Sequence, residues 1–185
     1  VEILLSDGDL CDARLLSERL ARDRYHLRIS RDLDVAKAYL RERYAENPEA
    51  RFGLIASSRD RDLERFGVKN GYQDTKLLKD HPDGRSCRTL RDCVTEFGAQ
   101  GLELDAALVA WGTDFEYRGG EWSNENARKY RETGRVRSAS QLRTNSYRVM
   151  LTRGRDATVV FVPPIGRLDE TYRRLIVAGF VELSR

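Results

Sequence analysis

Arginine side chains gather in one stretch of the chain, residues 134–155. The stretch contains six arginines and no acidic residue, so it carries +6, while the whole 185-residue chain carries +3. A guanidinium offers a planar set of donors that binds phosphate oxygens in pairs, so the stretch predicts a phosphate-binding surface. Two simpler explanations stay open: a solvated helix face, and the arginine-rich composition typical of a GC-rich genome. The six are Arg135, Arg137, Arg143, Arg148, Arg153 and Arg155.

A second stretch whose residue types could bind a ligand covers residues 95–105 and reads TEFGAQGLELD. Gly101 allows the backbone to approach a ligand closely. Gln100, Glu103 and Asp105 present polar side chains from a tight turn or a short helix. Taken alone, the pattern is also that of an ordinary loop with one glycine and several acids.

The third stretch covers residues 145–155 and reads NSYRVMLTRGR. Its apolar spacing predicts a helix over 141–152 with one buried face. Arg153 and Arg155 then lie at the C-terminal end of that helix. The helix dipole favours cations there, so a purely structural role for both arginines stays open beside phosphate binding.

Together and in this order, the second and third stretches resemble the second motor domain of superfamily 1 helicases and translocases. Residues 95–105 resemble motif V, Thr-x-x-x-x-(Gln/Lys)-Gly-x-Glu, and residues 149–154 resemble motif VI, Val-x-Leu-Thr-Arg-(Ala/Gly). The fuller strings, followed by a strand that ends in Val-Pro, resemble bacterial Schlafen-group-3-like helicase-domain proteins, an ATPase family of poorly defined function. The specific resemblance covers residues 95–163.

The resemblance implies a nucleotide-facing set of residues. Arg153 would be the catalytic arginine finger on the γ-phosphate. Gly101 and Glu103 would lie by the sugar and phosphates. Gln100 would lie near the γ-phosphate or couple it to the nucleic-acid track. Arg59 is a weaker candidate for a second γ-phosphate contact, because other arginines follow it closely.

The resemblance also implies a nucleic-acid-binding set. Thr95 would contact the backbone of DNA or RNA. Arg148 and Arg155 would bind phosphates, or they would pair with Asp105 or Glu103 instead. Both alternatives fit the sequence equally well.

Two motifs that a complete motor needs are missing from these 185 residues. None of the five lysines follows a glycine, so there is no Walker A loop, and no acid pair follows an apolar strand as in Walker B. The resemblance therefore implies an ATP site, with ATP and Mg²⁺, shared with an N-terminal RecA-like domain of the same polypeptide. This chain would lack its own P-loop and be inactive alone. Its single methionine, Met150, also favours a fragment of a longer protein.

The elements that must position these motifs are short apolar runs at residues 52–56, 93–97, 106–111 and 158–162. We predict that these are central strands. Helical spacing over 10–20, 33–44, 141–152 and 168–176 places helices between them, and this alternation predicts an α/β fold with a mainly parallel sheet covered on both faces. The resemblance makes it a RecA-like, three-layer domain. One domain over 1–185 is expected, with polar excursions at about 68–91 and 113–140.

Composition excludes several other classes. No apolar run approaches the roughly 18 residues of a membrane helix. Three cysteines without a CxxC pair, and only two histidines, argue against a disulfide scaffold and a metal site. A cytoplasmic protein is therefore expected.

The alternative function is a stand-alone module that binds nucleic acid without catalysis. A nuclease is favoured only by Asp74-Thr75-Lys76, which lies in a polar excursion rather than on a strand.

Overall fold

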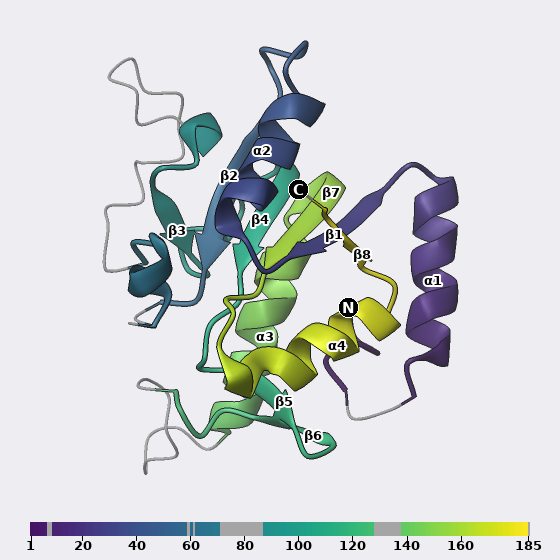
Figure 1. Cartoon of the computed structure of the whole chain (residues 1–185), viewed down its shortest axis with the longest axis vertical. Helices are drawn as coiled ribbons and strands as arrows, with labels where there is room; N and C mark the ends of the chain where they lie inside the picture. Colours follow the sequence, from purple (N-terminus) through teal and green to yellow (C-terminus); the bar gives the residue numbers. More distant parts are fainter. Residues whose placement is uncertain (7–8, 59, 61, 71–86, 128–137, 185) are drawn as a thin grey trace.

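The computed structural model describes residues 1–6, 9–58, 60, 62–70, 87–127 and 138–184. Helices and strands alternate along the chain (Figure 1). The helices are α1 (Cys11–Arg22), α2 (Leu33–Arg43), α3 (Ala139–Leu151) and α4 (Asp169–Val177), with the short 3-10 helices η1 (Leu63–Phe66), η3 (Cys87–Thr89) and η4 (Gly166–Leu168). The strands are β1 (His26–Ser30), β2 (Phe52–Ala56), β3 (Cys93–Thr95), β4 (Leu104–Ala110), β5 (Glu116–Arg118), β6 (Glu121–Ser123), β7 (Gly154–Phe161) and β8 (Val181–Glu182).

Six of these strands form one sheet in the order β3-β2-β4-β7-β1-β8, and each neighbouring pair is parallel. β5 and β6 form a separate antiparallel hairpin. The α/β class and the mainly parallel sheet predicted from the sequence are confirmed. The centre of the sheet is β4, which lies between β2 and β7 and is buried along almost its whole length.

Side chains of the central strands alternate between two hydrophobic clusters, one on each face of the sheet. In β4, Ala107 and Val109 belong to the cluster under α3 and α4, whereas Leu108 and Ala110 belong to the cluster under α2. Figure 1 shows the helices on either side of the strands, with α1 beyond β1. The result is three layers, as expected.

Some predicted elements are shorter than expected. The strand predicted over 93–97 ends at Thr95, because the chain enters a turn at Glu96. The segment after β2 forms only the 3-10 turn η1, which ends at Gly67 in the left-handed region, φ +81°. Left-handed backbone suits glycine and ends a helical turn.

The excursion expected at about 113–140 begins inside the core. Thr113, Asp114, Phe115 and Glu116 are all buried, and the ring of Phe115 stacks on Trp122 of β6 at 4.6 Å between centroids. Most of the excursion at about 68–91 lies outside the described residues.

The connections leave the sheet on opposite faces next to its centre. After β2 the chain runs over the α2 face toward β3, and after β4 it runs over the opposite face through α3 toward β7. Neighbouring parallel strands whose connections diverge in this way form a topological switch point, where α/β proteins commonly bind ligands. The carboxyl ends of β2 and β4 are such a point.

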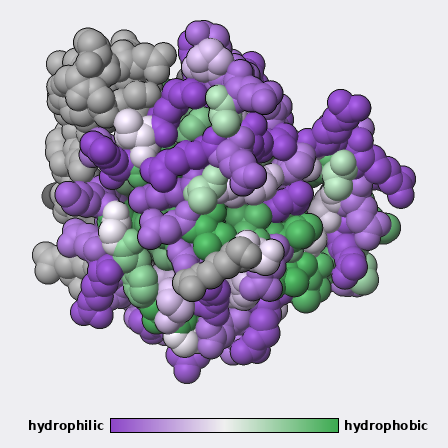
Figure 2. Space-filling model, turned by 45° about the horizontal axis from the view of Figure 1, so that its top comes forward, coloured by the Kyte–Doolittle hydropathy of each residue, from purple (hydrophilic) through white to green (hydrophobic). Residues whose placement is uncertain are grey.

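The surface in Figure 2 is mostly hydrophilic, with an apolar area across its middle. Exposed apolar side chains include Leu15, Leu16 and Leu20 of α1 and Val177 of α4. No helix within the described ranges is both long and apolar enough to cross a membrane.

Gly154, the first residue of β7, has no room for a side chain. A Cβ built there would lie 2.0 Å from the Ala157 carbonyl oxygen and 3.0 Å from the Ala107 nitrogen, both backbone atoms that cannot easily move. We expect Gly154→Ala to lower the free energy of unfolding by about 1–3 kcal/mol, as overpacked sites do. Thermal and urea unfolding of the 185-residue chain measure this. Gly166→Ala is the matched control, because nothing lies within 4 Å of its Cβ position. Equal stability of the two variants would contradict the prediction.

Candidate functional site

The motif V-like and motif VI-like segments meet at the amino-terminal ends of β4 and β7. Leu104 pairs with Gly154 in the parallel register, and the Leu104 amide donates to the Arg153 carbonyl oxygen at 3.2 Å. Glu103 and Arg153, which directly precede the two strands, are therefore neighbours at one edge of the sheet. The structure thus brings together two segments that lie about fifty residues apart in the sequence.

Arg153 lies just beyond the C-terminal end of α3 and is half-buried. Its Nε donates to the Val149 carbonyl oxygen at 2.9 Å, and its Nη2 contacts Thr152 Oγ1 at 3.3 Å. In the part of the chain that the structure describes, no carboxylate forms an ion pair with Arg153. The Nε–H group of Arg153 therefore caps a carbonyl oxygen at the end of the helix, while N–H groups on its Nη atoms can still bind an anion.

The three nucleotide-facing candidates of the motif V-like turn, Gln100, Gly101 and Glu103, are all exposed. It begins with a hydrogen bond from the Ala99 amide to the Thr95 carbonyl oxygen at 2.9 Å. Gly101 has φ +77°, a backbone conformation that L side chains rarely adopt, although there is open space around it. The glycine is thus required by conformation rather than by close packing.

Thr95 does not lie with the nucleotide-facing candidates. It ends β3 level with Ala56 of β2, which pairs with Ala110 at the carboxyl end of β4. The segment 96–103 then returns to the amino-terminal end of β4. The candidates for nucleic acid and for nucleotide in this segment therefore lie at opposite edges of the sheet.

A groove of about 210 Å³ lies between the motif V-like turn and α3. Exposed Phe97 and Leu142 contribute its apolar surface. The complete lining is Glu96, Phe97, Gln100, Leu142, Asn145, Ser146 and Val149.

Both other arginines of the motif VI-like segment are paired with acids. Arg155 bonds to Asp105 at 2.6 Å, which is one of the two partners foreseen from the sequence. Arg148 pairs instead with Glu2, with Nη2 2.5 Å from a carboxylate oxygen. These ion pairs are largely exposed and therefore weak, so a phosphate could replace the acid. Their role in nucleic-acid binding stays a prediction.

The described part of the arginine-rich stretch therefore does not form one continuous cationic surface. Of its four described arginines, Arg143 is buried, Arg148 and Arg155 form surface ion pairs, and Arg153 alone has no carboxylate partner among the described residues. The other two lie outside the described residues, as does Arg59.

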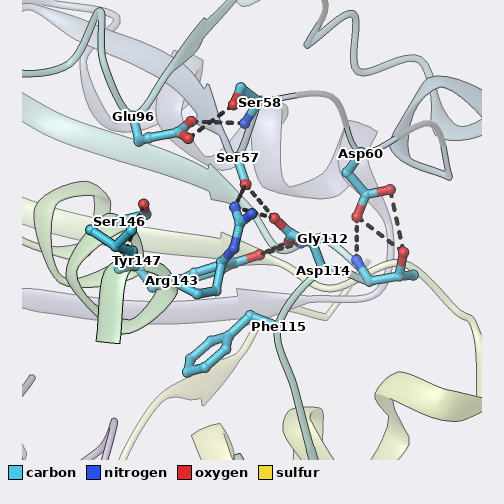
Figure 3. A network of polar contacts seen from close by, with 12 residues as sticks. Ser57, Ser58, Asp60, Glu96, Gly112, Asp114, Phe115, Arg143, Ser146 and Tyr147 are labelled. Atoms are coloured by element: carbon cyan, nitrogen blue, oxygen red, sulfur yellow. Dashed lines mark hydrogen bonds and ion pairs between the residues drawn. The ribbon is translucent and has the colours of Figure 1, made fainter. Parts of the chain in front are cut away.

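Sequence reasoning missed a buried polar network at the switch point between β2 and β4 (Figure 3). Arg143 of α3 lies 2.5 Å from Asp114, and these side chains are only 1% and 6% exposed. Arg143 also donates to Ser57 Oγ at 2.5 Å, and Ser57 donates to Asp114. Tyr147 donates to Asp114 at 2.7 Å and accepts from the Gly112 amide at 2.9 Å. The four-residue spacing of Arg143 and Tyr147, which places both on one helix face, was the available signal.

Burial governs the protonation of this network. Burial raises the pKa of Asp114, and the Arg143 cation opposes that rise. Burial and the nearby Asp114 charge raise the pKa of Tyr147 well above its ordinary value, so the phenol remains a donor at neutral pH.

Three comparisons place the chain among known proteins. The family model described as Schlafen group 3, DNA/RNA helicase domain, matches residues 5–164. A solved structure, the C-terminal domain of a possible DNA helicase from Lactobacillus plantarum WCFS1, is similar at 14% identity and a TM-score of 0.39 over 94% of this chain and 96% of that one. No curated protein matches the chain.

Asp105 makes the stability of the motif V–VI edge depend on pH. Burial raises its pKa, but the hydrogen bond from the Arg51 amide and the Arg155 cation outweigh this and hold the pKa below the ordinary 3.8. A lowered folded-state pKa contributes stability above the unfolded value, and that contribution is lost as the pH falls through the folded-state pKa.

We therefore expect Asp105→Asn to lower the melting temperature at about pH 6, with the gap to wild type closing toward about pH 3. Arg155→Ala should show a smaller change of the same sign, because the Arg51 amide remains. Melting curves over this pH range measure both. A gap that is constant with pH would contradict the assignment.

Proposed function

The chain belongs to the Schlafen group 3 DNA/RNA helicase-domain family, and from that membership we propose that it is the C-terminal motor domain of a nucleic-acid-dependent ATPase or helicase. It contributes motif V and the motif VI arginine finger to an ATP site shared with an N-terminal RecA-like domain. Arg153 is the finger, and Gln100, Gly101 and Glu103 face the nucleotide. Arg59, outside the described residues, stays a weaker proposed contact, because it directly follows Ser58 at the carboxyl end of β2, opposite the edge that carries Arg153.

The observation that carries this proposal is the hydrogen bond from the Leu104 amide to the Arg153 carbonyl oxygen. It joins the two motif segments at the starts of neighbouring strands. A shared phosphate site needs a cation and small or polar groups at one edge, where a second domain can close on them. At that edge, the Arg153 guanidinium has no carboxylate partner among the described residues. The turn at Gly101 leaves the backbone open, because glycine has no side chain.

The side chains at this edge can contact the γ-phosphate and the ribose of a bound nucleotide, but not all of its phosphates. Arg153 can bind phosphate oxygens, Gln100 can donate a hydrogen bond near the γ-phosphate, and Glu103 can accept hydrogen bonds from a ribose. The backbone cradle for the other phosphates, its lysine and the acids for Mg²⁺ have no counterpart in the sequence, so we assign them to the N-terminal domain. Bound Mg²⁺ would neutralise charge on the phosphates.

Thr95 is proposed to contact nucleic acid at the carboxyl edge of the sheet. Arg148 and Arg155 are proposed to exchange their acidic partners for backbone phosphates, and Arg155 would do so at the amino-terminal edge, where β7 places it beside Asp105. The first test of the whole proposal is the substitution of Arg153.

In the full polypeptide that carries the Walker A loop, Arg153→Ala should lower ATP turnover by about 10³-fold or more. A guanidinium stabilises charge that develops on the γ-phosphoryl oxygens in the transition state more than it stabilises bound ATP, so nucleotide affinity should fall much less. Arg153→Lys should also lower ATP turnover strongly, since the point charge of an ammonium group cannot reproduce the planar fork of a guanidinium. Steady-state ATPase assays and nucleotide titrations measure the two effects.

Arg41→Ala is the matched control, because Arg41 is also a helix-end arginine, in the last turn of α2, and its Nη2 donates to the carbonyl oxygen of Thr89, outside both motif segments. A purely structural helix-end cation is worth about 0.3–1 kcal/mol. Arg153→Ala with near-normal turnover and a slightly lower melting temperature would remove Arg153 from the site and sink the proposal.

The 185-residue chain alone should hydrolyse ATP no faster than background, because a lone finger supplies only part of the required stabilisation. A phosphate-release assay on a purified preparation measures this. Turnover that disappears in Arg153→Ala would show that the chain holds a complete site. Steeply salt-dependent nucleic-acid binding, with no turnover even in the full polypeptide, would instead favour a binding module.

A further inference from the structure

Two adjacent serines at the carboxyl end of β2 each hold one of the two motif-bearing segments. Ser57 accepts a hydrogen bond from Arg143 of α3, the helix that leads to Arg153, at 2.5 Å. Ser58 donates to Glu96, the residue after Thr95, from its amide at 2.7 Å and from its hydroxyl at 2.9 Å. Figure 3 shows both contacts side by side.

We propose that Ser57 and Ser58 form an anchor that fixes motif V and motif VI relative to each other. The two segments then meet correctly aligned at the opposite edge of the sheet. This inference rests on the proposed function, because it explains how that site is aligned. Ser57, Ser58, Glu96 and Arg143 are positioning residues and touch no substrate.

The contact geometry supports a rigid anchor. Ser57 is fully buried, and its carbonyl oxygen accepts from Asn70 Nδ2 at 2.6 Å. Glu96 is 2% exposed. Buried charged groups keep one arrangement when hydrogen bonds satisfy them, because any displacement leaves a desolvated charge without its partner.

The two segments carry this alignment across the sheet. Beyond Arg143 and Tyr147, α3 continues for one further turn to Leu151 before Arg153, and a helix is stiff over that length. Beyond Glu96, the motif V-like turn packs Ala99 and Leu102 into the cluster under α3. Both segments then end at the Leu104–Arg153 hydrogen bond, so loosening either anchor should loosen that bond.

The location also suits a coupling role. The anchor lies at the switch point between β2 and β4, beside Thr95 at the proposed nucleic-acid edge. The groups at this switch point are bonded to one another, which favours an internal joint over a ligand pocket.

The test uses Ser57→Ala and Ser58→Ala, which remove one hydroxyl each and leave the charges in place. Ser30→Ala is the matched control: Ser30 is also buried and ends the parallel strand β1 at the same edge, and its hydroxyl accepts from the Asp32 amide at 3.0 Å. Replacing Arg143 would instead leave Asp114 buried without its cation, and the chain would be expected not to fold.

The first readout needs no catalysis. Hydrogen exchange of the Leu104 amide in the 185-residue chain reports whether the two motif segments stay joined. We expect exchange at least about tenfold faster in both anchor variants than in Ser30→Ala at matched melting temperature. Unchanged Leu104 exchange in both variants would overturn the inference, whatever the activity.

The second readout is turnover by the full polypeptide. We expect the anchor variants to lower kcat about tenfold or more with KM for ATP within about twofold, and the double variant to lose no more than the worse single one, because both act on one alignment. Normal kcat in the anchor variants beside a strong loss in Arg153→Ala would reject the anchor and keep the proposed function. Normal turnover in Arg153→Ala would reject the proposed function, and Leu104 exchange would then decide on the anchor.

Discussion

The parallel pairing of β4 with β7 is the constraint on which the candidate site depends. These strands share the centre of the sheet, and their registered residues, such as Val109 opposite Val160, are fully buried. Because a shift by one residue would turn every side chain to the other face, the register is tightly specified. The register shifts by one residue between Leu104 and Ala106, so that Leu104 pairs with Gly154, and the motif segments that precede both strands meet at this pair.

Hydrophobic burial alone would not set the angle of α3 on the sheet. Apolar side chains tolerate small shifts, whereas the Arg143–Asp114 pair and Tyr147 require specific partners. Burying such a pair costs desolvation that its attraction only partly returns, so it is weak evidence for stability. Its effect here is geometric: it selects one placement of the helix that ends at Arg153.

The sequence was sufficient for the central strands and for the helicase-domain family. Short apolar runs marked β2, β4 and β7 because strands buried on both faces have few other compositions. It was insufficient for Arg143 and Asp114, since a charged residue is normally read as exposed and their contact joins distant segments. The end of β3 at Thr95 was also missed, because the bond between Glu96 and Ser58 is tertiary and leaves no local pattern.

The separation of the two candidate edges follows from the same topology. In a parallel sheet all strands point one way, so residues after the strands and residues before them necessarily face opposite directions. Thr95 follows β3, while Glu103 and Arg153 precede β4 and β7. With nucleic acid and nucleotide at these two edges, as proposed, a signal between them must travel the length of the strands. The motif V-like turn and α3 both span that distance on one face, and both are held at Ser57–Ser58. Movement of one segment against the other would change the contact at Leu104, so this pair of segments physically connects the two edges.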